Sequence, residues 1–152
     1  MKLDVQDITS EDEQLSNVYY VIDAEDVEKK GRSFDALLLV RRCSSCKKEI
    51  GGFGSGQHQK DQIKKIEKCC SEAEDFLQPG MPLQEIVFRL LLKGGNRPTA
   101  ISELHYALTE DLAKPTHPMN ITVQALRNIL EKDHYYGFKE TAQRSTPRRP
   151  KK

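Results

Sequence analysis

The arrangement of the cysteines constrains this chain more than any other feature of its sequence. Cys43 and Cys46 form a C-x-x-C pair, and 22 residues separate it from the adjacent pair Cys69 and Cys70. Two pairs of thiolates from separate segments are typical of a tetrahedral structural zinc site, which holds a small domain together. The sequence therefore predicts a Zn²⁺ ion bound by these four cysteines.

The adjacent pair leaves other interpretations open. Neighbouring residues on a helix point about 100° apart, so Cys69 and Cys70 reach one ion only where the helix unwinds. His58 is therefore a reserve ligand that could replace one of them. An iron–sulfur cluster, disulfides, buried thiols, or a redox-sensing pair of Cys43 and Cys46 are the remaining alternatives.

Composition and charge predict a soluble protein with an uneven charge distribution. Hydrophobic residues make up 37% of the chain. No apolar run reaches the roughly 18 residues of a membrane helix, and the start lacks a signal-like stretch, so we expect a cytoplasmic protein without membrane contact.

Residues 1–78 contain 12 basic and 16 acidic side chains, 79–138 contain 6 of each, and 139–152 contain 6 basic and 1 acidic. This gradient predicts contact with nucleic acid or another acidic surface at the C-terminal end.

The first half predicts a small α+β module behind an acidic arm. Residues 1–16 carry few apolar side chains, which indicates disorder. Residues 18–22 are all β-branched or aromatic and predict a buried strand. Ser33 is an expected N-cap. Three helices are expected, over residues 24–30, 34–42 and 59–70. We therefore assign residues 17–78 to a zinc-binding-type module with four cysteine ligands.

The second half has a different character. A Pro/Gly break at residues 78–82 is the predicted domain boundary. Thr99 is the expected N-cap of the second helix beyond it, and Asn120 or Thr122 is that of the third. The aromatic residues within 135–138 predict a short strand or turn. Apolar residues recur at helical spacing in three segments, which are 82–93, 99–112 and 122–133. The predicted fold class is therefore α+β and mainly helical.

Residues 80–140 resemble the winged helix-turn-helix superfamily in their order of three helices and an aromatic β segment. The resemblance implies a winged-helix-like domain whose third helix enters the major groove of DNA. The outward side of that helix would then present Gln124, Arg127 and Asn128, which are types of side chain that contact base edges. The formal charge of residues 79–138 is zero, however, whereas binding to phosphates usually relies on a basic surface. Many winged helices bind proteins instead.

The C-terminal end and the absence of catalytic motifs complete the functional prediction. Residues 141–152 predict a disordered basic tail in which Arg144, Arg148 and Arg149 contact phosphates. The sequence contains no phosphate loop, catalytic triad spacing or H-E-x-x-H motif, so we expect neither enzyme activity nor a small-molecule substrate.

The leading hypothesis is a zinc-containing, nucleic-acid-binding protein such as a transcriptional regulator. The alternative is a protein–protein interaction adaptor that uses the winged-helix surface, with zinc purely structural.

Overall fold

A computed structural model describes residues 18–42, 56–78, 80–112 and 120–141, with backbone only for 56–58. The described elements are β1 (Tyr19–Ile22), α2 (Ala24–Lys29), α3 (Phe34–Leu39), α5 (Gly56–Lys68), the 3₁₀ turn η1 (Cys70–Glu72), α6 (Leu83–Lys93), β2 (Thr99–Ala100), α7 (Ile101–Tyr106), the π-helical turn η2 (Ala107–Asp111), α8 (Val123–Lys132) and β3 (Phe138–Thr141). The protein is therefore a mostly helical α+β protein, as predicted. Within these ranges, no helix combines the length and apolar character needed to span a bilayer.

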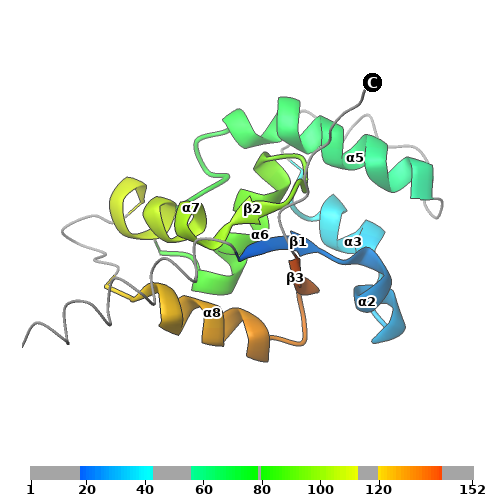
Figure 1. Cartoon of the computed structure of the whole chain (residues 1–152). Helices are drawn as coiled ribbons and strands as arrows, with labels where there is room; N and C mark the ends of the chain where they lie inside the picture. Colours follow the sequence, from blue (N-terminus) through cyan, green and yellow to red (C-terminus); the bar gives the residue numbers. More distant parts are fainter. Residues whose placement is uncertain (1–17, 43–55, 79, 113–119, 142–152) are drawn as a thin grey trace, which may run out of the picture.

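A small antiparallel sheet joins distant parts of the chain. Its strand order is β2-β1-β3, so β1 lies in the middle. Tyr19 pairs with Ala100 on one side, and Tyr20 pairs with Glu140 on the other. Figure 1 shows the blue β1 between the yellow-green β2 and the orange-red β3. The strand predicted for the first half of the chain therefore forms a sheet with two strands from beyond the predicted boundary at 78–82.

Helix α6 lies at the centre of the hydrophobic core. Its buried side chains are Ile86, Val87, Phe88, Leu91 and Leu92, all 0% exposed. They belong to one cluster with apolar side chains from β1, α2, α3, α5, α7 and α8. Full burial of each such side chain contributes about 1.5–3 kcal/mol. The core thus draws on both halves of the chain, and α6 supports the helices on either side of it.

Two of the three predicted helix caps are present. Ser33 Oγ accepts a hydrogen bond from the Ala36 amide at 3.1 Å, and Thr122 Oγ1 accepts one from the Ala125 amide at 3.0 Å. The prediction that Thr99 caps the next helix was wrong. Thr99 pairs with Tyr20 in the sheet, and its hydroxyl donates to the Arg97 carbonyl instead. Pairing with β1 takes this residue into a strand, so α7 begins without a side-chain cap.

The turn after α6 positions β1 through a side chain. Gly95 and Asn96 both have left-handed backbones, with φ values of 76° and 57°. The Asn96 side-chain nitrogen Nδ2 donates to the Ile22 carbonyl at 3.0 Å, and Oδ1 of the same side chain accepts from the backbone amide of Ile22 at 2.8 Å. The side chain therefore makes the pair of bonds that another strand would make. It fixes the end of β1 against α6.

Candidate functional site

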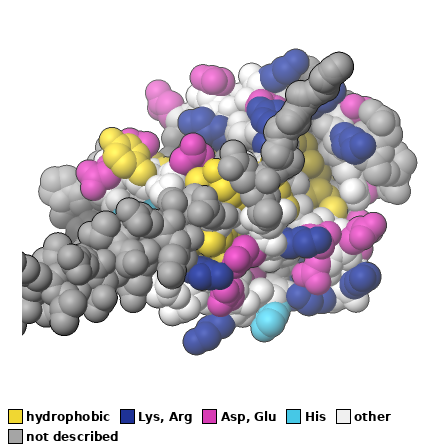
Figure 2. All heavy atoms as spheres, viewed as in Figure 1, with side chains coloured by type: hydrophobic (Ala, Val, Ile, Leu, Met, Phe, Trp, Pro, Cys, Tyr) yellow, Lys and Arg dark blue, Asp and Glu magenta, His cyan; other side chains and the backbone are white. Residues whose placement is uncertain are grey.

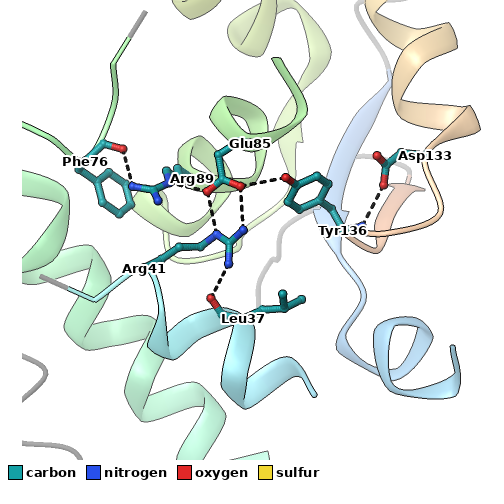
Figure 3. Close-up of polar contacts among 7 residues, drawn as sticks. All are labelled: Leu37, Arg41, Phe76, Glu85, Arg89, Asp133 and Tyr136. Atoms are coloured by element: carbon teal, nitrogen blue, oxygen red, sulfur yellow. Dashed lines mark hydrogen bonds and ion pairs between the residues drawn. The ribbon is translucent and has the colours of Figure 1, made fainter. Parts of the chain in front are cut away.

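A buried polar cluster lies where α3, α6 and the segment after α8 meet (Figure 3). Arg41 follows α3 and forms a bidentate ion pair with Glu85 on α6. Its Nε donates to Oε2 at 2.9 Å, and its Nη2 donates to Oε1 at 2.7 Å. Its remaining nitrogen, Nη1, donates to the Leu37 carbonyl at 2.7 Å. The guanidinium also stacks 4.7 Å from the centre of the Phe88 ring. Arg41 thereby links the end of α3 to α6.

Two further side chains complete this Arg41–Glu85 cluster. Arg89 lies one turn beyond Glu85 on α6 and donates from Nε to Oε2 at 2.6 Å. Tyr136, between α8 and β3, donates its hydroxyl to Glu85 Oε1 at 2.9 Å. Arg89 also donates to the Phe76 carbonyl. Glu85 therefore accepts four hydrogen bonds, as Figure 3 shows, and holds three segments of the chain together.

The electrostatics of the cluster favour a fixed, ionised carboxylate. Burial raises the pKa of Glu85, but hydrogen bonds from Arg41 and Arg89 outweigh it and hold that pKa below its ordinary value of 4.5. Burial, and then the bond to Glu85, raise the pKa of the Tyr136 hydroxyl to about 12. Both groups keep one protonation state around neutral pH. Such a carboxylate, with its oxygens already occupied, serves positioning rather than proton transfer.

A second buried arginine anchors the same segment. Arg42 Nη1 donates to Gln62 Oε1 on α5 at 3.2 Å, and both side chains are buried. The consecutive residues Arg41 and Arg42 therefore attach the chain to α6 and to α5 immediately before Cys43. These contacts thus fix the last described residues before Cys43 against the core.

The predicted metal ligands fall partly outside the described residues. Cys43 and Cys46 lie there, as does the side chain of His58. Cys69 follows the end of α5, is exposed, and takes part in a disulfide bond. Cys70 begins η1 and has a thiol that is 0% exposed within the core.

The regular helix ends at this pair, because α5 stops at Lys68 and the 3₁₀ turn η1 begins at Cys70, although Cys69 keeps a right-handed helical backbone (φ −117°, ψ −61°) and its amide still donates to the Lys65 carbonyl at 2.8 Å. Even so, Cys69 and Cys70 lie in different surroundings. A thiolate must approach zinc to about 2.3 Å. Cys69 would meet this requirement only after its disulfide bond is reduced, and Cys70 is packed in the core. Among the described residues, no group of three or more histidine, cysteine, aspartate or glutamate side chains could hold a metal ion.

The predicted base-contacting side chains do share one side of α8. Gln124 and Asn128 are exposed and hydrogen-bonded to each other at 3.2 Å. Arg127 lies between them in the sequence and contacts carboxylates on two elements. Its Nη2 lies 3.1 Å from Glu140 Oε2 on β3, and its Nε lies 3.3 Å from Glu131 Oε2 on α8. We call these five residues the α8–β3 face. Partial burial lowers the pKa of Arg127, but the two carboxylates outweigh it and raise that pKa.

A polar cleft of about 360 Å³ adjoins this face, between α2 and the end of α8. We call it the α2–α8 cleft. Its lining residues are Asp23, Asp26, Lys30, Glu131, Asp133, His134, Phe138 and Lys139. Four carboxylates thus face two lysines and one histidine. Figure 2 shows magenta and dark-blue side chains interspersed over the lower part of the molecule, where Figure 1 places α8 and α2. The described surroundings of α8 are therefore neutral to acidic.

Sequence reasoning missed the Arg41–Glu85 cluster and the hydrogen bonds from the Asn96 side chain to the Ile22 backbone. Glu85 carried a weak signal, because an acidic residue in the first turn of a helix is explained by the helix dipole alone. The tail residues Arg144, Arg148 and Arg149 lie outside the described part of the chain.

No family model matches the chain, and no curated protein and no solved structure is significantly similar to it.

Proposed function

We propose that this protein is a non-catalytic protein-interaction adaptor whose partner docks on the α8–β3 face and the α2–α8 cleft. The observation that carries the proposal is the environment of Arg127. Its guanidinium lies against Glu131 and Glu140, which leaves this part of the face without net positive charge. A side chain paired in this way is poorly placed to attract a phosphate backbone.

Nucleic acid would face an additional electrostatic cost at this surface. If Arg127 turned toward a base, Glu140 and Glu131 would remain near the phosphates without their cation. Affinity for nucleic acid comes largely from basic side chains that neutralise phosphates. The α2–α8 cleft also has more carboxylates than lysines. This charge suits a protein partner that inserts a lysine or arginine side chain, with Gln124 and Asn128 supplying hydrogen bonds around it.

We also propose that the cysteines have a structural role, with Zn²⁺ bound by Cys43, Cys46 and at least one of Cys69 and Cys70. The anchoring of the chain by Arg41 and Arg42 supports this role, because it fixes the approach to the first pair. Zinc would cross-link this segment to the end of α5 without redox chemistry. The structure has Cys69 in a disulfide bond, so zinc would use Cys69 only as the reduced thiolate, and a structural disulfide is the competing proposal.

The test of the adaptor proposal is recovery of a partner by the full chain after nuclease treatment. We expect the full chain to recover a stoichiometric protein partner. That partner should be lost when Glu131→Lys reverses the charge of a side chain that lines the α2–α8 cleft. The matched control is Glu110→Lys, which makes the same charge change at an exposed position on η2. Equal retention of the partner by both variants would contradict docking at the α8–β3 face.

Nucleic-acid binding remains the second candidate, because the order α6, α7, α8, β3 is the order on which the winged-helix resemblance rests. It requires binding to duplex DNA that falls steeply with salt. Binding should then weaken when Arg127→Ala is combined with deletion of residues 144–152. If DNA binds with this dependence and no protein partner survives nuclease treatment, the adaptor proposal fails.

A further inference from the structure

A second cleft, of about 340 Å³, lies between α5 and the turn that follows α6. Helix α5 supplies Lys60, Ile63, Lys64 and Glu67, whose spacing places them on one side of the helix. The turn supplies Gly95, Asn96 and Arg97. We call this the α5 cleft. In Figure 1, α5 lies at the top of the molecule and α8 at the bottom, so the cleft is remote from the α8–β3 face.

The wall of the cleft formed by the turn is held in place by the fold. The amides of Gly95 and Asn96 donate to the Leu92 and Leu91 carbonyls at 2.9 and 2.8 Å. The Asn96 side chain is bonded to the backbone of Ile22. A ligand therefore meets a preformed surface here and does not have to order the turn.

The charge of the α5 cleft is positive. It holds the cations of Lys60, Lys64 and Arg97 against the single carboxylate of Glu67. Within the described ranges, neither lysine has a carboxylate at ion-pair distance. Figure 2 shows dark-blue side chains, with magenta ones among them, along the upper part of the molecule, where Figure 1 places α5.

The ion pair between Arg97 and Glu67 lies across Gly95. Arg97 Nη2 is 2.8 Å from Glu67 Oε2, and the Arg97 side chain is 68% exposed. A methyl group on Gly95 would lie 2.7 Å from Glu67 Oε1 and 2.9 Å from Arg97 Nη1, so glycine leaves room for the pair. Exposed ion pairs contribute little stability, so a stronger anion can take Arg97 from Glu67.

We propose that the α5 cleft binds a small phosphate-bearing anion. A phosphate dianion matches the excess of positive charge, and Arg97 can hold it through two parallel hydrogen bonds while the lysines contact its other oxygens. Ile63 gives an apolar contact for a ring or sugar attached to the phosphate. The cleft has the volume of a small ligand site and not the extended length of a duplex groove.

The test is titration of the full chain with inorganic pyrophosphate and, separately, with adenosine monophosphate, followed by calorimetry. We expect saturable binding that Lys60→Gln and Lys64→Gln each weaken by about fivefold, because each removes one cation about 4 Å from the anion in a solvated site. Glu67→Gln should tighten binding, since it removes the competitor for Arg97. The matched control is Lys132→Gln on α8, which makes the same charge change elsewhere and should leave affinity unchanged.

The outcomes distinguish the sources of the phosphate. Tighter binding of the mononucleotide would identify a nucleotide, and tighter binding of pyrophosphate would identify a free phosphate anion; either supports the proposal. Absence of saturable binding, or equal weakening by Lys132→Gln, would overturn it. A single-stranded oligonucleotide that binds far more tightly than both probes, with the same dependence on Lys60 and Lys64, would reassign the cleft to a nucleic-acid backbone. Far-UV circular dichroism of each variant ensures that the comparison is between folded proteins.

Discussion

Replacing Glu85 by glutamine should destabilise the protein by about 2–4 kcal/mol. The carboxylate accepts four hydrogen bonds, three of them from arginine nitrogens. Glutamine keeps the size of the side chain, but it removes the negative charge and directs an NH₂ group at donors. The Arg41 side chain is only 7% exposed, so water cannot replace the lost carboxylate oxygen. Most of the expected loss comes from this buried charge without its counterion.

Urea denaturation followed by far-UV circular dichroism measures the loss. The matched control is Glu131→Gln, whose side chain is 50% exposed and pairs with Arg127 at 3.3 Å. That change should cost no more than about 0.5 kcal/mol, because exposed ion pairs contribute little. If Glu85→Gln and Glu131→Gln lower the free energy of unfolding equally, the reasoning about the Arg41–Glu85 cluster is refuted.

A double substitution separates the charge from its packing. Glu85→Leu alone leaves Arg41 buried beside an apolar side chain, whereas Glu85→Leu with Arg41→Met removes both charges. We expect the double variant to be more stable than Glu85→Leu, because breaking a buried pair on one side costs more than replacing both partners. Strictly additive losses would show that the two side chains do not depend on each other.

The same carboxylate should leave a signature in the pH dependence of stability. Because Arg41 and Arg89 hold the pKa of Glu85 below 4.5, its contribution is fully present above that pH and is lost as pH falls through the lowered value. The Glu85→Gln variant lacks the contribution of the ionised carboxylate at every pH, so its stability does not fall in acid for this reason. The free energies of unfolding of the wild type and the variant should therefore converge in acid, as measured by urea denaturation over a pH series.

The remaining predictions concern two turns and the cysteines. Gly137→Ala should destabilise by about 3 kcal/mol, because φ is 79° and the methyl group would lie 2.6 Å from Val27 Cγ2; Gly31→Ala, at φ 88° in open space, should cost only about 1 kcal/mol, and equal thermal midpoints would contradict this. Asn96→Ala should cost about 2 kcal/mol in urea denaturation by leaving the Ile22 backbone groups without partners, whereas exposed Asn128→Ala should be near neutral. Protein purified without added metal should contain stoichiometric zinc by elemental analysis, with thiols that become titratable only after chelation. A metal-free protein with a disulfide at Cys69 would exclude zinc but retain the cross-link.

Local features of the fold followed from the sequence, whereas its long-range contacts did not. The strand at β1 and the caps at Ser33 and Thr122 depend on neighbouring residues, so pattern and side-chain type were sufficient. Thr99 has the same chemistry as Thr122, yet pairing with β1 placed it in a strand. Which strands would pair was not visible, because register between distant segments depends on the whole core.

The candidate sites follow the same division. The outward position of Gln124, Arg127 and Asn128 on α8 follows from helical periodicity. The carboxylate of Glu140 that neutralises Arg127 comes from β3, and its approach depends on how β3 packs beside α8. Arg89 lies only four positions from Glu85, but Arg41 and Tyr136 lie 44 and 51 positions away in sequence, so no local pattern could identify the whole cluster. Charge at a site therefore required the fold, although the side chains that line it did not.

The central position of β1 also determines when the sheet can form during synthesis. Tyr20 is among the first described residues, and Glu140, which lies opposite it on β3, is 120 positions later. At about 5–20 residues per second, translation separates the two strands by roughly 6–24 s. Throughout that interval one edge of β1 has no β3 to pair with, and exposed strand edges are templates for association with other chains. The nascent chain therefore depends on its early helices, or on a chaperone, to cover a strand whose native neighbour does not yet exist.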